Sequence, residues 1–347
     1  MPQVFDDARL DDQGALAAVD QTLRSLAESG ARVRRESGEA AGAVAEAVAK
    51  AGESRPRAVI AAGPDSRLLR AVLEPWCPVP FVAWPGPSLP GWAGGLDLVV
   101  VLAPEGSDTG AASAVAEAVR RGAQVVVACP PRSLVAEHAV GRDSTVLPCA
   151  SGDQLATAVV MLQVLDGLDL GPESDPESVA QALDEVAISC SPYRDLSVNP
   201  AKMLTLALAD STPLLWGGSV LAARAARRVA EAIRRASGRT ALAGDAEHLL
   251  PVIAAAVPRD VFADPFADGD GEEPAPRPPA LVVLDDGAEG ASIREQRGRL
   301  TALAGEQDVR VEAILSDSGT DVARYAALLA SGTYAAAYLG VGLTPSR

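Results

Sequence analysis

Residue types that commonly mark metal and redox sites are scarce in this chain. Its 347 residues include 2 His and 4 Cys, and the cysteines have no paired CxxC spacing. A metal site built on several histidines is therefore excluded, and we expect no metal. We expect the cysteines to be small buried hydrophobic residues in a reduced cytoplasm.

Positive charge and long hydrophobic runs are also scarce. The formal net charge is −16, from 30 basic and 46 acidic residues, and Lys50 and Lys202 are the only lysines. This charge repels polyanions and no basic cluster offsets it, so we expect no nucleic-acid partner. Apolar runs such as residues 96–104 have about half the length of a membrane span. We therefore expect a soluble protein, and the lack of a charged-then-apolar leader before MPQVFDDARL favours the cytoplasm.

Two series of short apolar segments follow one another along the chain. Helical segments or Pro/Gly turns separate them, and this pattern predicts parallel sheets with helices on both faces. The fold class is therefore α/β, with two tandem αβα sandwich domains. The expected strands are 57–63, 79–84, 97–104, 124–130 and 144–149, then 212–218, 239–244, 260–264, 280–286 and 309–315.

The length and the repeated pattern indicate two domains. Residues 10–52 have apolar residues at helical spacing, interrupted near residues 28–33, and predict two leading helices. We expect an N-terminal domain over 1–155, a helical bridge over 156–199 and a C-terminal domain over 200–347. The acidic, Pro-rich segment 263–279 is expected to be a solvated loop.

Ligands of open parallel sheets bind where strands end, because helix N-termini there offer free N–H groups. Three turns qualify: AAGPDSRLL (61–69), APEGSDTGAAS (103–113) and CPPRSL (129–134). In the second turn, Ser107 and Thr109 supply hydroxyls to an anion. Glu105 and Asp108 oppose an anion, and Asp108 is a natural cap for a helix that begins at Thr109. The turn is compatible with an anion site and with an ordinary capped turn.

Charged side chains near the other strand ends extend the list of candidates. Arg67 and Arg132 would supply positive charge to these turns, or lie solvated on helix faces. His248 follows the strand expected at 239–244, beside Asp245 and Glu247, and suits acid/base work or a helix cap. No GxSxG, P-loop or GxGxxG motif is present, so hydrolase and nucleotide-binding functions are disfavoured and no cofactor is expected.

Several segments together resemble the SIS (sugar isomerase) fold, and specifically the bifunctional phosphoglucose/phosphomannose isomerase family. The first runs from VPFVAWPG to the strand QVVVAC and is similar to the part of that family around its sugar-phosphate turn. TPLLWGGSVLAARAARRVAEAI, DVFADPF and LLASGTYAAAYLGVGLTPSR look like successive landmarks of its second domain. The resemblance covers most of the chain from about residue 55.

The resemblance implies the isomerisation of hexose 6-phosphates between aldose and ketose. In this family, hydroxyls of the first domain hold the phosphate, a histidine opens the sugar ring and a glutamate moves a proton between C1 and C2. Carried over, Ser66 and Thr109 match the phosphate turns, His248 matches the histidine and Thr344 matches a C-terminal threonine. A sugar-phosphate ligand and a homodimer follow from the same resemblance.

Three functional side chains of the family have no match here. Ile233, Arg234 and Arg235 occupy the place of the base glutamate, and arginine does not deprotonate at these pH values. The segment ASGDQLATA (150–158) replaces the family's arginine, and its terminal lysine is missing.

Two hypotheses therefore follow, with a ligand-free scaffold as a weaker third. In the first, Glu247 or Glu231 replaces the base and Arg234 moves onto the phosphate or the enediolate. In the second, a catalytically degenerate member binds a sugar phosphate or a partner protein in a regulatory role.

Overall fold

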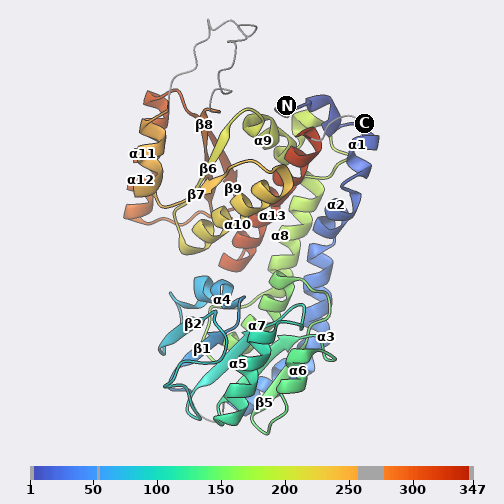
Figure 1. Ribbon diagram of the computed structural model, residues 1–347, viewed down its shortest axis with the longest axis vertical. Helices are drawn as coiled ribbons and strands as arrows, with labels where there is room; N and C mark the ends of the chain where they lie inside the picture. Colours follow the sequence, from blue (N-terminus) through green and yellow to red (C-terminus); the bar gives the residue numbers. More distant parts are fainter. Residues whose placement is uncertain (1–3, 53–54, 257–276, 344–347) are drawn as a thin grey trace, which may run out of the picture. The chain divides into compact units, whose positions relative to one another are not determined.

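The computed structural model describes residues 4–52, 55–256 and 277–343. These residues form two compact α/β units, each built on one parallel sheet (Figure 1). One unit is Glu28–Asp184, and the other combines the chain up to Ala27 with the chain from Glu185 onward. The predicted fold class, with parallel sheets and helices, is confirmed.

The Glu28–Asp184 unit has a five-stranded sheet in the order β2-β1-β3-β4-β5. Strands β1, β3 and most of β4 are fully buried, as expected when helices cover both faces of a parallel sheet. The strands are β1 (Val59–Ala62), β2 (Phe81–Trp84), β3 (Leu98–Leu102), β4 (Gln124–Cys129) and β5 (Ser144–Pro148). The helices are α3 (Ser29–Ala51), α4 (Ser66–Leu73), α5 (Thr109–Arg120), α6 (Leu134–His138) and α7 (Gln154–Gly167).

Alternation along these strands divides the core between the two faces of the sheet. Ile60, Val99 and Val125 point to one side and pack in a buried cluster with Ala111 and Val135 of α5 and α6. Helices α3 and α7 pack against each other, and α7 also contacts β3 and β4.

The second unit has a four-stranded sheet in the order β7-β6-β8-β9. The strands are β6 (Thr212–Gly217), β7 (Leu242–Ala243), β8 (Pro279–Asp285) and β9 (Arg310–Leu315). Helices α11 (Ala246–Ala254) and α12 (Ala291–Glu306) pack with Leu214 and Trp216 of β6 in one cluster. Helices α9 (Pro200–Leu208), α10 (Val220–Ser237) and α13 (Asp321–Leu343) pack together as another group. The strand expected at 260–264 lies outside the described residues.

The compact units divide the chain differently from the expected domains. The short helices η1 (Asp7–Leu10), α1 (Gln13–Ala17) and α2 (Asp20–Ala27) belong to the second unit rather than to the first. The reason is long-range bonding: the Asp6 amide donates to the Gly342 carbonyl, and Arg9 Nε donates to the Val341 carbonyl.

The segment expected as a bridge is shared between the units. Helix α7 lies in the first unit and α9 in the second, while α8 (Pro176–Ser189) contains the division between Asp184 and Glu185. The short helix η2 (Leu196–Val198) precedes α9. The interruption expected near residues 28–33 is confirmed, because α2 ends at Ala27 and α3 begins at Ser29.

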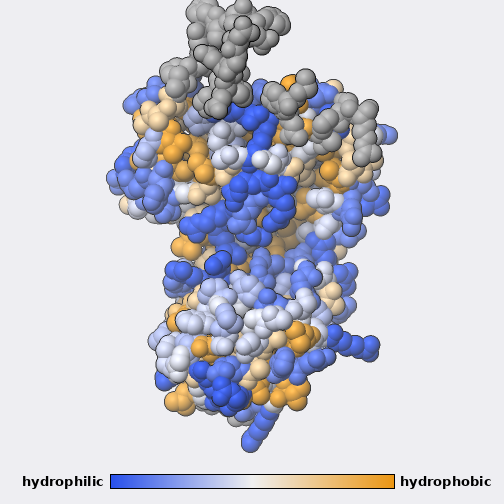
Figure 2. Space-filling model, viewed as in Figure 1, coloured by the Kyte–Doolittle hydropathy of each residue, from blue (hydrophilic) through white to orange (hydrophobic). Residues whose placement is uncertain are grey.

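Among the described helices, only α13 is long and apolar enough to cross a membrane. However, 72% of its apolar window is buried inside the protein, as in the core helix of a soluble domain. The face of the molecule in Figure 2 is mostly hydrophilic, with small separate apolar patches.

Candidate functional site

The three turns singled out in the sequence meet at the carboxyl edge of the first sheet. A Cβ on Gly63 of the β1 turn would lie 3.4 Å from the Ala111 Cβ of α5. A Cβ on Gly106 of the β3 turn would lie 2.4 Å from the Ser133 Cβ of the β4 turn. Gly63 and Gly106 also have positive φ angles of 86° and 68°, so side chains are disfavoured at both positions.

The β3 turn offers two reachable hydroxyls and a capped helix start. Ser107 and Thr109 are exposed. The Ala111 amide donates to Asp108 Oδ1 at 2.6 Å, so Asp108 caps α5 as predicted. Because this cap places a carboxylate at the helix start, it occupies part of the positive end that an anion would use.

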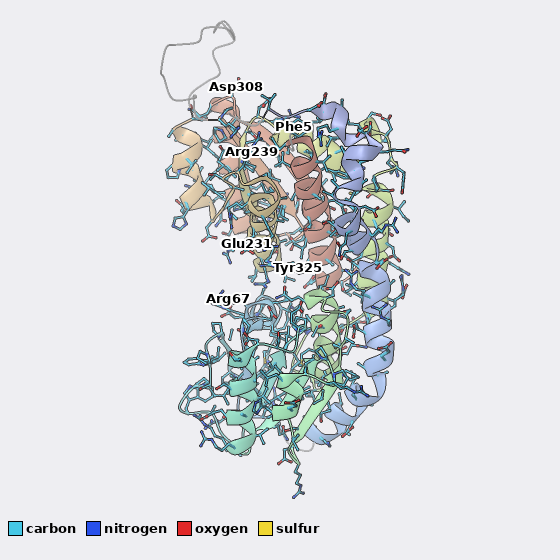
Figure 3. All side chains as sticks on the ribbon, turned by 45° about the vertical axis from the view of Figure 1, so that its right-hand side comes forward. Phe5, Arg67, Glu231, Arg239, Asp308 and Tyr325 are labelled. Carbon is cyan, nitrogen blue, oxygen red and sulfur yellow. The ribbon has the colours of Figure 1, made fainter. Side chains whose placement is uncertain are left out.

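The β1 and β4 turns hold the other predicted residues of this unit. Ser66 is fully buried, and its Oγ has no hydrogen-bond partner among the described residues. Arg67, which follows it on α4, is exposed (Figure 3). Arg132 of the β4 turn is exposed as well. Of these three side chains, only the two arginines therefore reach the surface.

A protein carboxylate fills the fourth turn of this edge, between β5 and α7. Glu36 of α3 is 1% exposed. Its Oε2 accepts a hydrogen bond from the Ala150 amide at 3.0 Å, and its Oε1 accepts one from the Ser151 amide at 2.6 Å. Burial, followed by the Glu36 charge, raises the pKa of the neighbouring Cys149 to about 12. This turn overlaps residues 150–158, the segment that stands where the family has its arginine. Here the carboxyl group of Glu36 occupies the turn.

The predicted catalytic pair of the second unit lies on α11, after β7. His248 and Glu247 are both exposed. Arg299 of α12 donates to Glu247 Oε1 at 2.6 Å, and this hydrogen bond raises the pKa of Arg299. Glu247 is therefore engaged in a surface ion pair between α11 and α12.

Arg234 lies away from this pair. Its Nη1 donates to the Ala241 carbonyl at 2.7 Å, immediately before β7 begins, whereas His248 follows the end of that strand. Arg234 thus lies at the amino end of β7 and does not meet His248 or Glu247 there. Thr344 lies outside the described residues.

Helices α10 and α13 bring together a polar group that the sequence identified only in part. Arg224, Arg228 and Glu231 recur at positions i, i+4 and i+7 of α10, which places them on one helix face. Tyr325 of α13 is 1% exposed and lies beside Glu231 (Figure 3). Burial raises the pKa of Tyr325, while the charges of Arg224 and Arg228 and a hydrogen bond to Arg224 act in the opposite direction.

Glu231 is the carboxylate of this group. Arg228 Nη1 donates to Glu231 Oε2, and 39% of the Glu231 side chain is exposed. The sequence suggested Glu231 as one substitute base, but the role of Tyr325 was missed. In the sequence, the helical spacing of Arg224, Arg228 and Glu231 was the signal that could have indicated this group. No sequence pattern indicated that Tyr325 of α13 would join it. Elsewhere in the described residues, no group of three His, Cys, Asp or Glu side chains is placed to hold a metal ion.

A scan against protein families matches residues 197–343 to the bacterial phospho-glucose isomerase C-terminal SIS domain. These residues are therefore similar to a SIS domain. The matched range contains α9 to α13 and the whole second sheet. The resemblance to the SIS fold that the sequence indicated is thereby confirmed for this part of the chain.

Solved structures show the same fold over most of the chain. The tagatose-6-phosphate ketose/aldose isomerase from Escherichia coli aligns with a TM-score of 0.68 and 12% identity, covering 93% of this chain and 94% of the isomerase. A candidate phosphosugar isomerase from Silicibacter pomeroyi aligns with a TM-score of 0.61 and 15% identity, covering 91% and 95%. The search of curated proteins gave no match. At these identities the likeness concerns the fold alone.

Proposed function

We propose that this protein interconverts the aldose and ketose forms of a hexose 6-phosphate, with Glu231 as the base. The observation that carries this proposal is the Arg228–Glu231 pair in a SIS domain, next to a buried tyrosine hydroxyl. In the reaction, the Glu231 carboxylate takes the proton from C2 of the open-chain aldose. The electron pair forms the enediolate, a proton passes from O2 to O1, and the same carboxyl returns its proton to C1, which leaves the carbonyl at C2 and gives the ketose.

Glu231 is preferred over Glu247 as the base. Both carboxylates are in ion pairs, but 69% of the Glu247 side chain is exposed, on the α11–α12 layer. Only 39% of the Glu231 side chain is exposed, and on α10, in the other helix layer, it lies beside the buried Tyr325. His248 belongs to the same layer as Glu247, so His248 and Glu231 do not act together within one unit. We propose that a second copy of the chain supplies the histidine, which makes the protein a homodimer.

A coupled assay with fructose 6-phosphate tests the proposal, with glucose 6-phosphate and mannose 6-phosphate measured separately. We expect turnover by the natural protein, its loss in Glu231→Gln, and little change in Glu247→Gln. Incorporation of deuterium from D₂O into the product would report the proton transfer directly. Equal turnover by Glu231→Gln and the natural protein would overturn the assignment of the base. Light scattering of the purified chain measures the oligomeric state.

The second candidate function is the binding of a sugar phosphate without turnover, as a regulatory protein. Ile233, Arg234 and Arg235 favour it, because they occupy the place of the family's base glutamate and arginine does not deprotonate at these pH values. Under this alternative, calorimetry detects binding of fructose 6-phosphate while deuterium exchange is absent. The cytoplasmic location remains a proposal too, for which fractionation of cells is the test.

A further inference from the structure

Arg224 is a partly buried cation whose charge no carboxylate of the described residues balances. Its neighbour Arg228 is paired with Glu231, and Arg227, on a different face of α10, lies 3.9 Å from Asp245. Among the described residues, Arg224 Nε is buried and has no hydrogen-bond acceptor. A buried guanidinium N–H without an acceptor costs free energy, so such a group is usually completed by a partner.

The surroundings of Arg224 fix its position and leave the cluster positive. The Arg224 guanidinium donates a hydrogen bond to the hydroxyl oxygen of Tyr325, which is itself 1% exposed. Helices α10 and α13 approach closely here because residue 332 is glycine: a Cβ there would lie 2.3 Å from Val229 Cγ2. Two guanidinium groups, Arg224 and Arg228, and one carboxylate, Glu231, leave one net positive charge.

We propose that Arg224 and Tyr325 form a binding site for a phosphoryl group on the C-terminal SIS domain. A guanidinium presents N–H groups in a planar fork that matches the oxygens of phosphate, and its charge strengthens each hydrogen bond. A phosphoryl oxygen would accept from the Arg224 guanidinium, which is partly exposed, and the Tyr325 hydroxyl would hold that group in place. This site is separate from the hydroxyls of the first unit, and it needs no turnover.

Arginine modification by phenylglyoxal, mapped by mass spectrometry on the full chain, tests the site directly. Inorganic phosphate is added to one sample and sodium chloride of equal ionic strength to the other. We expect phosphate to slow the modification of Arg224 about tenfold, while Arg235, an exposed arginine further along α10, reacts at an unchanged rate. Equal protection of both arginines, or of neither, would overturn the proposal.

Calorimetric titration with inorganic phosphate provides the second readout. We expect Arg224→Gln to weaken phosphate binding at the mapped site about tenfold, and Arg235→Gln to change it less than twofold. Tyr325→Phe removes a single oxygen and keeps the ring in the core, so it tests the site without a large packing change. We expect it to weaken binding several-fold; binding by both Arg224→Gln and Tyr325→Phe equal to that of the natural protein would overturn the proposal.

The same experiments distinguish the source of the phosphoryl group. Glycerol 3-phosphate replaces inorganic phosphate as a simple phosphate ester. Protection of Arg224 by both ligands assigns the site to the phosphoryl group in general, and protection by inorganic phosphate alone assigns it to free phosphate. Glu231→Gln is the variant that separates this proposal from the proposed reaction. If that variant loses turnover but Arg224 is still protected, the two proposals stand independently; if Arg224 is unprotected in an active protein, only the phosphoryl site fails.

Discussion

Lys202 Nζ donates to Asp11 Oδ1 at 2.6 Å, although 191 positions separate the two residues in the chain. Lys202 is completely buried, and its ammonium also donates to the carbonyls of Pro192 and Arg194. All three protons of the ammonium therefore have acceptors, which is the condition for burying this charge. The bond attaches the first residues of the chain to the rest of the second unit.

Replacing Lys202 with methionine keeps the length of the side chain and removes its donors. We expect Lys202→Met to lower the free energy of unfolding by about 3 kcal/mol, because buried acceptors lose their partner. The other lysine is the control: Lys50 forms an exposed pair with Glu46, and we expect Lys50→Met to change stability by about 0.5 kcal/mol or less. Guanidinium denaturation measures both, and equal losses would contradict the prediction.

Glu36→Gln should destabilise the Glu28–Asp184 unit. The neutral amide has one acceptor oxygen and accepts weaker hydrogen bonds from Ala150 and Ser151 than the carboxylate does. We expect a loss of about 1.5–3 kcal/mol in the free energy of unfolding. Glu39→Gln, at an exposed position on the same helix, should stay within about 0.5 kcal/mol. Thermal unfolding of the two variants provides the comparison.

Glycine-to-alanine changes on two helices should have opposite signs. In Gly332→Ala the new methyl group would meet Val229, so α10 and α13 must separate, at a cost of about 1–3 kcal/mol. In Gly298→Ala of α12 nothing lies within 4 Å of the new Cβ, and we expect a gain of about 0.5–1 kcal/mol. Melting temperatures that shift in the same direction would contradict the packing argument.

The raised pKa of Cys149 predicts a loss of stability at alkaline pH. The folded state binds the thiol proton more tightly than the unfolded chain does, because burial, and then Glu36, disfavour the thiolate. This contribution is complete below the ordinary thiol pKa of about 8.5 and is lost as the pH rises towards the folded-state pKa of about 12. Denaturation midpoints from pH 7 to about 11 should therefore fall more steeply for the natural protein than for Cys149→Ala. Equal slopes for the two proteins would show that Cys149 does not cause the loss of stability at alkaline pH.

Local patterns accounted for most of the fold. The strands at 59–62, 98–102 and 124–129 lie within segments that were recognisable as short β-rich apolar runs, and Asp108 was recognisable as a helix cap. These features depend on neighbouring residues, so the sequence carries them directly. The meeting of three turns at one sheet edge also followed, because parallel strands end on the same side.

The candidate site was less accessible to sequence reasoning. Alignment to a family's base glutamate reached Ile233, Arg234 and Arg235, whereas the carboxylate that the structure pairs with Arg228 is Glu231, two residues before Ile233. A shift of two residues in a helix turns a side chain to another face, and only the packing of α10 on α13 selects the face that meets Tyr325.

The sequence by itself determined the α/β class, the parallel strands and the turns where ligands can bind, since periodicity and capping are local properties. Tertiary structure decided that the first residues join the unit formed by the chain from Glu185 onward, and that Arg224, Glu231 and Tyr325 form one group. These outcomes rest on contacts between residues that are distant along the chain. Their free energy comes from burial and pairing in three dimensions, which no short segment contains.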